Sequence, residues 1–438
     1  MNKAKSSKNT DHFDVIVIGA GLCGITFLKY ALEQNLRCII LEKHQDVGGL
    51  WTWLPSWQDI QNRKADFSIN GIPLEGVTQP AIHRYAREWV REYNLEPFIK
   101  LQCKVASVSR VDYEWTVQTN QGIFRSAYLV VASGVQNEPW IPEIERTHSD
   151  ILELHSSGVK KPEDLAGKNV TVVGGGTSSW DLLELALKNG AKDIHWVYRS
   201  IKWFMPTKGS KQAAWPNLRE LAVIQSIQKS PKGVSAFLRW LLKIRYNSAQ
   251  LNTLKPTEPF DIGKHQLIPG RSLMLQNLDR IICHQSDIRS LQGKEVALKN
   301  GEHFETDVIL WGTGYRMDLA FLGLPEYRHV NKLEDLKPKL GSLVRSMDYP
   351  NLFFIGMSLV DSTTSTPFFA AIEAKSIVAH ILGRCEIPGK NTPYHIAYWD
   401  LFRYFAGFDH ANYSRGWSIR YFLRALWYMF FRNKTVKI

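Results

Sequence analysis

Two glycine-rich turns hold the residues of this sequence whose types and spacing best fit ligand chemistry. The first turn is Gly19-Ala-Gly21-Leu-Cys-Gly24, and Glu42 lies 18 residues beyond its last glycine. Glycines at these positions permit a tight turn and a close approach of the backbone to a pyrophosphate at a helix N-terminus. We expect the Glu42 carboxylate to accept hydrogen bonds from ribose hydroxyls and to repel a 2′-phosphate. The first turn therefore predicts a site for a dinucleotide with a free ribose.

The second turn is Gly174-Gly-Gly176-Thr177-Ser178-Ser179. Ser179 takes the place of the third glycine, where a small residue suffices for packing of the helix on the strand. The next apolar run ends in Tyr198-Arg199-Ser200 rather than in an acid. Because a guanidinium pairs bidentately with a phosphate, Arg199 and Ser200 indicate a dinucleotide that carries an extra phosphate. The alternative is a surface arginine at the end of a strand.

Two hydroxyl residues of the second turn allow two interpretations. Thr177 and Ser178 stand where the helix should begin. We expect them either to bind phosphate or to cap the helix.

Short apolar runs on either side of each turn must position these residues. Runs of four or five apolar residues, each next to a glycine turn or to a helical stretch, are typical of buried parallel strands. The expected strands are 14–18, 38–41, 170–173 and 194–197, and the expected helices are 25–34 and 180–189.

The two turns look like one structural unit used twice, and each is followed by strand-type patterning that ends in a glycine motif. Strand-type patterning at 114–122 and 295–301 leads into apolar runs that end in glycine, and one further run ends at Gly356. Ligands of open α/β sheets bind at the carboxyl ends of strands, so Thr313, Gly314 and Gly356 are expected to contact a cofactor. Gly49-Leu50-Trp51 is expected to contact a second part of the first ligand, because the double glycine lets the backbone pass close to it.

Taken together, these motifs resemble those of the class B flavin-dependent monooxygenases, and within that class the flavin-containing monooxygenases. The resemblance extends over about residues 13–383. It implies an α/β fold with two Rossmann-like dinucleotide-binding domains, one for FAD and one for NADPH. The motifs that carry it are Gly48-Gly49-Leu50-Trp51, His155-Ser156-x-x-x-Lys160-x-Pro162, Gly167-Lys168-x-Val170, Arg199-Ser200-x-x-Trp203-x-x-Pro206 and Gly312-Thr313-Gly314-Tyr315.

The chain departs from the family in one motif. Of the pattern F-x-G-x-x-x-H-x-x-x-Y/F it keeps His155, but Ser149, Ile151 and Val159 stand at the other three positions. Baeyer–Villiger-type relatives have Trp-Pro or Trp-Asp after that histidine, and this chain does not. The departure favours oxygenation of a heteroatom.

The resemblance also implies a reaction. NADPH reduces FAD, the reduced flavin and O2 form a C4a-hydroperoxyflavin, and an apolar substrate receives one oxygen atom at a nitrogen or sulfur. Asn62 would support the hydroperoxide, with a surface loop as the alternative, and His155 would hold the domain junction, with a plain structural histidine as the alternative. Ketone oxygenation of the Baeyer–Villiger type, a non-oxygenating flavin reductase or oxidase, and an inactive cofactor-binding module remain open.

Composition excludes several other classes. The five cysteines are scattered without a C-x-x-C, which argues against a disulfide framework, a dithiol centre or a zinc site and favours a reducing cytosol. The net charge is +12, but six basic residues and no acid lie within 411–438, and no nucleic-acid motif accompanies them. We therefore expect no nucleic-acid partner and no metal.

The charge and composition also suggest a domain plan. We predict an FAD-binding domain over 1–165 that returns over 301–387, an NADPH-binding domain over 166–300, and a basic, helical extension over 388–438. Apolar and basic residues segregate in the extension and again in 234–245, as in a helix that lies on an anionic membrane surface. The alternatives are packing on the protein as lids or as contacts of a homodimer.

Overall fold

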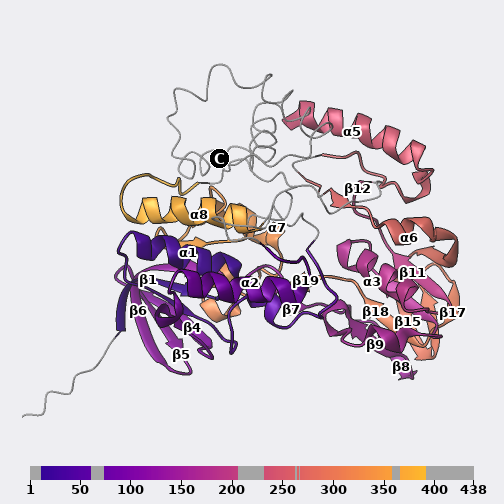
Figure 1. The fold of residues 1–438 in the computed structure, drawn as a ribbon, viewed down its shortest axis with the longest axis horizontal. Coiled ribbons are helices and arrows are strands. Elements are labelled where there is room, and N and C mark those ends of the chain that lie inside the picture. The colour runs from indigo at the N-terminus through magenta and orange to yellow at the C-terminus, as the bar shows by residue number, and fades with distance from the viewer. Residues whose placement is uncertain are drawn as a thin grey trace, which may run out of the picture.

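The computed structural model describes residues 11–60, 74–205, 231–261, 264–265, 267–357 and 366–390. These residues form two sheet-based units that lie side by side, one around each glycine turn (Figure 1). The predicted extension over 388–438 lies outside the described residues except for 388–390.

The first unit is built on a nine-stranded sheet in the order β20-β21-β22-β6-β1-β2-β3, with the β4-β5 hairpin paired to β6. Strand β1 is parallel to β2 and to β6, and Ile18 at its end is in register with Leu41 and with Val131. The strands are β1 (Asp11–Ile18), β2 (Cys38–Leu41), β3 (Ile99–Lys100), β4 (Val105–Val111), β5 (Glu114–Thr119), β6 (Gly122–Val131), β20 (Leu340–Gly341), β21 (Arg345–Ser346) and β22 (Leu352–Phe354).

Three helices cover one face of this sheet: α1 (Leu22–Glu33), α2 (Gln79–Glu92) and α8 (Thr366–Ile381) (Figure 1). Helix α1 begins three residues before the predicted start, inside the glycine turn. It is buried along most of its length, because Ile25, Phe27 and Leu28 pack among residues of β1, β2 and α8. The early start places the free N–H groups of the first helical turn at the carboxyl end of β1.

The second unit repeats this plan with a five-stranded, fully parallel sheet in the order β14-β11-β10-β18-β9. Its first helix, α3 (Thr177–Lys188), again begins three residues before the predicted start. A smaller sheet, in the order β17-β16-β15-β8, packs against it through Ile288, Leu291 and Val296. The strands are β8 (Glu145–Ser149), β9 (Leu152–His155), β10 (Val170–Val173), β11 (Ile194–Tyr198), β14 (Ile281–Gln285), β15 (Ile288–Gly293), β16 (Glu295–Leu298), β17 (His303–Glu305) and β18 (Val308–Trp311).

Short elements complete the second unit and connect the two units. Strand β7 lies in the connection between β6 and β8, and it pairs with β19, which follows β18. The two segments that pass between the units are therefore hydrogen-bonded to each other. These remaining elements are α5 (Pro231–Ser248), α6 (Ser272–Gln276), α7 (Leu333–Leu336), β7 (Glu138–Pro139), β12 (Phe204–Met205), β13 (Ile268–Pro269) and β19 (Tyr315–Arg316).

Strand pairing corrects two of the predicted domain boundaries. Strand β18 was assigned to the returning first domain by the boundary at residue 301, but it pairs with β10 in the second sheet. Strands β8 and β9, placed in the first domain by the boundary at residue 165, pair with β15 and β18. A strand belongs to the sheet that satisfies its backbone hydrogen bonds, so the chain leaves the first unit before Glu145 and returns only after Trp311.

No helix among the described residues is both long and apolar enough to cross a membrane.

Candidate functional site

A cleft of about 1360 Å³ runs between the two units along the carboxyl ends of the central strands. Both glycine turns line it, together with the residues that close β2, β11, β18 and β22. Its volume exceeds that of a usual single-ligand pocket. The predicted cofactor residues among its lining are Gly19, Gly21, Glu42, Gly49, Leu50, Trp51, Gly174, Gly176, Thr177, Ser178, Arg199, Ser200, Thr313, Gly314 and Gly356.

The first turn needs glycine at two positions for steric reasons. Gly19 has φ +108°, and a Cβ there would lie 2.6 Å from the carbonyl oxygen of Ala132. A Cβ at Gly24 would overlap the carbonyl oxygen of Gly19, so this glycine lets α1 sit against the end of β1. Gly24 is buried and shapes the turn from behind.

Glu42 is buried, and its carboxylate holds the first turn in shape. One oxygen accepts a hydrogen bond from the Ala20 N–H at 2.6 Å, and the other accepts one from the His44 N–H at 2.8 Å. A carboxylate has about four acceptor positions, so two remain for ribose hydroxyls. The residue predicted to recognise the ligand therefore also ties β2 to the glycine turn.

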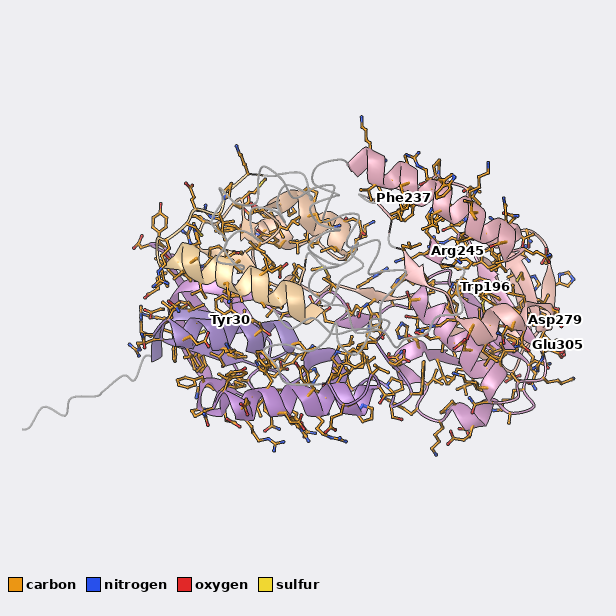
Figure 2. The ribbon with its side chains drawn as sticks, turned by 45° about the horizontal axis from the view of Figure 1, so that its top comes forward. Tyr30, Trp196, Phe237, Arg245, Asp279 and Glu305 are labelled. Atoms are coloured by element: carbon orange, nitrogen blue, oxygen red, sulfur yellow. The ribbon has the colours of Figure 1, made fainter. Side chains whose placement is uncertain are left out.

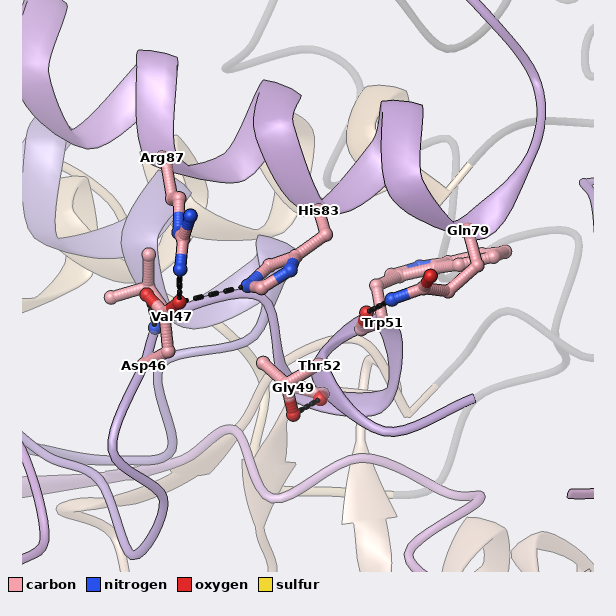
Figure 3. Close-up of polar contacts among 8 residues, drawn as sticks. All are labelled: Asp46, Val47, Gly49, Trp51, Thr52, Gln79, His83 and Arg87. Atoms are coloured by element: carbon pink, nitrogen blue, oxygen red, sulfur yellow. Dashed lines mark hydrogen bonds and ion pairs between the residues drawn. The ribbon is translucent and has the colours of Figure 1, made fainter. Parts of the chain in front are cut away.

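The Gly48-Gly49-Leu50-Trp51 segment passes over the first turn and is held there by α2 (Figure 3). The Gly48 N–H donates to the Ala20 carbonyl at 2.9 Å, and a Cβ at Gly49 would lie 2.9 Å from Cα of Gly21. From α2, the Gln79 amide donates to the Trp51 carbonyl. Because both glycines have positive φ, the backbone can cross the turn closely enough to share its ligand.

An ion-pair cluster at the start of this segment fixes its position (Figure 3). Asp46 accepts a hydrogen bond from Arg87 Nε at 2.7 Å and lies 3.1 Å from His83 Nε2. Burial by itself would raise the pKa of Asp46, but hydrogen bonds from Arg87 and Val47 and the nearby positive charges outweigh it and lower the pKa. Asp46 and Arg87 therefore stay charged at neutral pH and anchor the segment to α2.

The second turn packs more tightly than the first. A Cβ at Gly174 or at Gly175 would overlap the carbonyl oxygen of Gly312 or of Ser200, respectively. For a Cβ at Gly176, by contrast, the nearest atom would be Lys202 Cε at 3.8 Å. The first two glycines of the second turn are thus required by packing, and Gly176 leaves room beside the cleft.

Ser179 is accommodated because the strand opposite it carries a glycine. A Cβ at Gly312 would lie 2.7 Å from both N and Cα of Ser179. In the first unit the same contact is made between Gly24 and Ala132, where the two Cβ positions are 3.3 Å apart. The small residue has therefore moved from the helix to the strand. Ser179 Oγ donates to the Gly176 carbonyl at 2.6 Å and is buried, so it shapes the turn from behind the cleft.

Helix capping does not explain Thr177 and Ser178. The N-cap of α3 is Gly176, which has no side-chain cap, and Thr177 and Ser178 are the first two helical residues. Both line the cleft beside the N-terminus of α3. Phosphate binding thus remains the interpretation for this pair.

Arg199 lies at the far end of the cleft with its side chain 71% exposed, 3.5 Å from an Asp287 oxygen. The register pairs Val197 with Val173 and Leu41 with Ile18, so Tyr198 is the positional counterpart of Glu42 and Arg199 is one residue further along. Three further cations line this end of the cleft: Lys202, Arg289 and Lys299. This end is therefore suited to a phosphate.

Sequence reasoning missed Arg289 and Lys299 as members of this cationic group. Arg289 lies on β15 and Lys299 follows β16, so both are supplied by the smaller sheet. Lys299 Nζ lies 3.4 Å from Asp287 Oδ2. No motif marks these positions, because only the packing of the β15-β16 hairpin against β11 and β18 brings them to the cleft.

His155 lies behind the cleft and braces its wall. Its Nε2 is 2.8 Å from the Gly314 carbonyl, which can only accept, so Nε2 carries the proton and Nδ1 accepts from the Ser157 N–H. Burial lowers the pKa of His155, so the ring is neutral at pH 7. His155 is not among the described residues that line the cleft. This geometry fits the predicted role at the domain junction.

Three other predicted site residues are Asn62, Thr313 and Gly356. Asn62 lies outside the described residues. Thr313 Oγ1 donates to the Trp140 carbonyl, which joins the β18–β19 connection to the β7–β8 connection. The Gly356 N–H, at the end of β22, donates to the Glu373 carboxyl at 2.7 Å. Glu373 is fully buried, and burial raises its pKa to about 8.

A buried arginine that sequence reasoning missed links the two units. Arg271, which precedes α6, pairs with Asp181 on α3 and lies 3.7 Å from Asp59 of the first unit. Both carboxylates line the cleft. Removal of one partner from such a group leaves a buried charge unpaired, so Arg271 fixes how the units face each other.

The comparisons with known proteins agree with this architecture. The family model described as pyridine nucleotide-disulphide oxidoreductase matches residues 16–231. The "Uncharacterized oxidoreductase CzcO" of Bacillus subtilis (strain 168) is 27% identical over 71% of this chain and 84% of its own length. A Mus musculus protein named dimethylaniline monooxygenase 2 (N-oxide-forming) is 24% identical over 86% of this chain and 75% of its own.

Two solved structures share the fold over most of the chain. The flavin-containing monooxygenase from Stenotrophomonas maltophilia has a TM-score of 0.63, with 18% identity, and covers 86% of this chain and 100% of its own. The chain is a relative of the flavin-dependent monooxygenases. The structure titled as the OTEMO complex with FAD and NADP (form 1) has a TM-score of 0.67 and 18% identity, and covers 92% of each chain.

This relative of the flavin-dependent monooxygenases differs from a dithiol oxidoreductase in its cysteines. All five, which lie within the described residues, are free. Burial raises the pKa of Cys23 and of Cys38 far above neutrality, so neither is a thiolate at pH 7. The oxidoreductase chemistry of this chain therefore has no support from a cysteine pair in the part that the structure describes.

Proposed function

We propose that this chain uses FAD and NADPH to place one oxygen atom of O2 on a nitrogen or sulfur atom of an apolar substrate. Monooxygenase activity in general follows from its relatives, and FAD and NADPH are its cofactors. The choice of a heteroatom is our proposal. When bound, the flavin supplies the activation of O2 and the oxygen transfer, and NADPH supplies the hydride.

One observation carries the proposal: both glycine turns open into the same cleft. A ligand on each turn would therefore share one cleft, as hydride transfer between two cofactors requires. Gly19, Gly21, Glu42 and the Gly49-Leu50-Trp51 segment fit FAD. Gly174, Gly176, Thr177, Ser178, Arg199, Ser200 and their cationic neighbours fit NADPH.

The side chains of the cleft are suited to exclusion of water. Trp51, Trp53, Trp140, Tyr315 and Phe321 line it. Trp53 and Tyr315 contact each other with their ring centroids 6.1 Å apart, and Tyr315 also contacts His155 of the second unit with ring centroids 4.9 Å apart. Aromatic walls limit the access of water to a reactive oxygen species, and they also suit an apolar substrate.

Three acid–base groups at or near the cleft are held in structural contacts. Glu42 accepts two backbone hydrogen bonds, and Asp181 pairs with Arg271. His155 is neutral and turned toward Gly314. This supports a reaction in which the protein positions the cofactors and the substrate while the cofactors supply the chemistry.

The decisive experiment follows reduction and oxygen transfer separately in the purified full chain. NADPH is added without O2, and the flavin absorbance is expected to bleach. Air is then admitted together with a tertiary amine, a thioether or a cyclic ketone. We expect an N-oxide or S-oxide in proportion to the NADPH consumed, measured by mass spectrometry beside a peroxide assay.

Each other outcome points to a different function. An ester or lactone from the ketone, without heteroatom oxide, would replace the proposal by Baeyer–Villiger-type oxygenation. Hydrogen peroxide as the sole product with every substrate would indicate an oxidase, and bleaching followed by transfer of electrons to an added acceptor would indicate a reductase. Absence of bleaching would contradict all of these.

A further inference from the structure

Asp287 is a carboxylate that lies among the cations at the far end of the cleft. Its Oδ1 is 3.5 Å from Arg199 Nε, and its Oδ2 is 3.4 Å from Lys299 Nζ. All three residues line the cleft, together with Arg289. The end of the cleft that suits a phosphate therefore also contains a negatively charged hydrogen-bond acceptor.

The strand order of the second sheet explains why an acid stands at this place. Strand β14 is the parallel neighbour of β11, and Gln285 at its end is in register with Tyr198. The two strands therefore end side by side, and the turn at 286–287, which follows β14, lies next to Arg199, which follows β11. In the first unit the acid, Glu42, directly follows β2. The second unit thus also has an acid at this edge of its sheet, but the neighbouring strand supplies it.

The smaller sheet fixes the backbone of Asp287. The Lys299 N–H donates to the Asp287 carbonyl at 2.9 Å. The next residue, Ile288, is buried in the cluster of apolar side chains between the smaller sheet and β11. Figure 2 shows Trp196 of β11 and Glu305 of β17, at the end of the smaller sheet, in the same half of the molecule. The carboxylate is therefore held at the end of the cleft before a ligand arrives.

The ion pairs of Asp287 are exposed, so a ligand can replace them. The side chains of Arg199 and Lys299 are 71% and 63% exposed, and that of Asp287 is 39% exposed. Exposed ion pairs contribute little free energy, because water and salt screen them. A phosphate carries more negative charge than a carboxylate, so it would draw the two cations away from Asp287. A dinucleotide without that phosphate would leave the pairs intact and offer ribose hydroxyls to the carboxylate.

We propose that Asp287 is a specificity-determining residue that lets the second turn accept NADH as well as NADPH. With NADH, the carboxylate accepts hydrogen bonds from the free ribose, as predicted for Glu42 at the first turn. With NADPH, Arg199 and Lys299 bind the 2′-phosphate, and the negative charge of Asp287 weakens that binding. This inference rests on the proposed NADPH site at the second turn, and it does not depend on which substrate atom receives the oxygen.

Calorimetric titration of the oxidised, FAD-loaded full chain with NADP+ and with NAD+ tests the proposal. We expect the unchanged chain to bind both dinucleotides. Asp287→Asn keeps the size of the side chain and removes its charge. It should tighten NADP+ binding by about threefold and weaken NAD+ binding by about threefold, so the ratio of the two Kd values shifts by about tenfold. The gain for NADP+ should shrink as salt is raised, because salt screens the repulsion that the substitution removes.

A matched variant separates this site from a general change of charge. Asp193→Asn makes the same change at the opposite end of β11, outside the described lining of the cleft, and should leave both Kd values unchanged.

Three outcomes would overturn the proposal. Weaker NADP+ binding by Asp287→Asn would show that Asp287 holds the cations in place for the phosphate. An unchanged ratio of the Kd values, or no binding of NAD+ to the unchanged chain, would remove the role of Asp287 in the choice of cofactor. Flavin reduction without O2 is followed on the same proteins. Binding of both dinucleotides without bleaching of the flavin would contradict the proposed function and leave the assignment of Asp287 supported by the Kd values.

Discussion

At the scale of single residues, the side chains proposed for recognition at the two ends of the cleft differ in burial and in hydrogen bonding. Glu42 is buried and already bound to two backbone N–H groups, so its position is fixed before a ligand arrives. Arg199 is exposed and makes only a long ion pair with Asp287. A fixed carboxylate suits selection of one ribose, whereas an exposed guanidinium among other cations suits attraction of a phosphate. Glu42 thus has a structural part that Arg199 lacks.

Replacement of Arg199 should change the choice between nicotinamide cofactors. We expect Arg199→Ala to weaken NADPH binding by about tenfold while NADH binding changes little, because one charge-assisted hydrogen bond to a phosphate is lost and other cations remain. The measurement is the rate of flavin reduction as a function of each cofactor's concentration, without O2. Lys192→Ala, on the α3–β11 connection and outside the cleft lining, is the control. An equal loss for NADH and NADPH would contradict the assignment of Arg199 to the phosphate.

At the scale of elements, each helix N-terminus reaches its strand through a pair of small residues. The pair is Gly24 with Ala132 in the first unit and Ser179 with Gly312 in the second. The space available between helix and strand is conserved between the units, and the glycine can stand on either side of it. The sequence predicts that a small residue such as Ser179 suffices at the third glycine position, and the packing shows that Gly312 makes the room for it.

A substitution at Gly312 tests this compensation. We expect Gly312→Ala to lower the stability of the chain by about 1–3 kcal/mol, because the new methyl group would press on the backbone of Ser179. Addition of Ser179→Gly should restore part of the loss, since it recreates the pair of the first unit. Gly176→Ala, where the nearest atom would be 3.8 Å away, serves as the control. The melting temperature of the apoprotein reports all four proteins, and an unchanged value for Gly312→Ala would refute the packing argument.

At the scale of the whole molecule, buried titratable groups couple folding to pH in two directions. Burial lowers the pKa of His155 and of His380, and burial together with the charge of His284 lowers the pKa of His195 to about 4. Below about pH 6.5 the unfolded chain therefore binds more protons than the folded chain through these groups. Burial raises the pKa of Glu373 to about 8, so the folded chain keeps a proton there that the unfolded chain releases above about pH 4.5.

Stability should therefore be greatest near pH 6.5. The three histidine contributions are lost as pH falls from about 6.5 toward the lowered pKa values of the folded chain. The Glu373 contribution is lost progressively as pH rises from about 4.5 to about 8, and below about pH 6.5 the three histidines outweigh this one carboxyl. Each group can contribute a slope of up to about 1.4 kcal/mol per pH unit. We expect His195→Gln to flatten the acid limb and Glu373→Gln to flatten the alkaline limb of melting temperature against pH. His303→Gln, at an exposed histidine on β17, is the control. Identical alkaline limbs with and without Glu373→Gln would show that this carboxyl is not protonated in the folded chain.

The sequence by itself determined the two strand–turn–helix units and the repeated plan, and it predicted a cofactor preference for each turn. These features are local: the glycines, the following helix and the residue that closes the next strand lie within about 30 residues of one another, as a βαβ unit requires. The starts of α1 and α3 were each missed by three residues, because the glycine turn itself contributes the first helical turn.

Only the tertiary structure decided which sheet each later strand joins and what surrounds the cleft. Strands β8, β9 and β18 belong to the second unit, and Arg271, Arg289 and Lys299 reach the cleft or its wall from segments without any motif. Strand pairing over long separations depends on which partner satisfies the backbone and buries the apolar side chains, and nearby residues do not encode that choice. Helix α5 follows the same rule. Its sequence shows apolar and basic residues, and only the packing of Leu242 and Tyr246 shows which apolar side chains remain exposed.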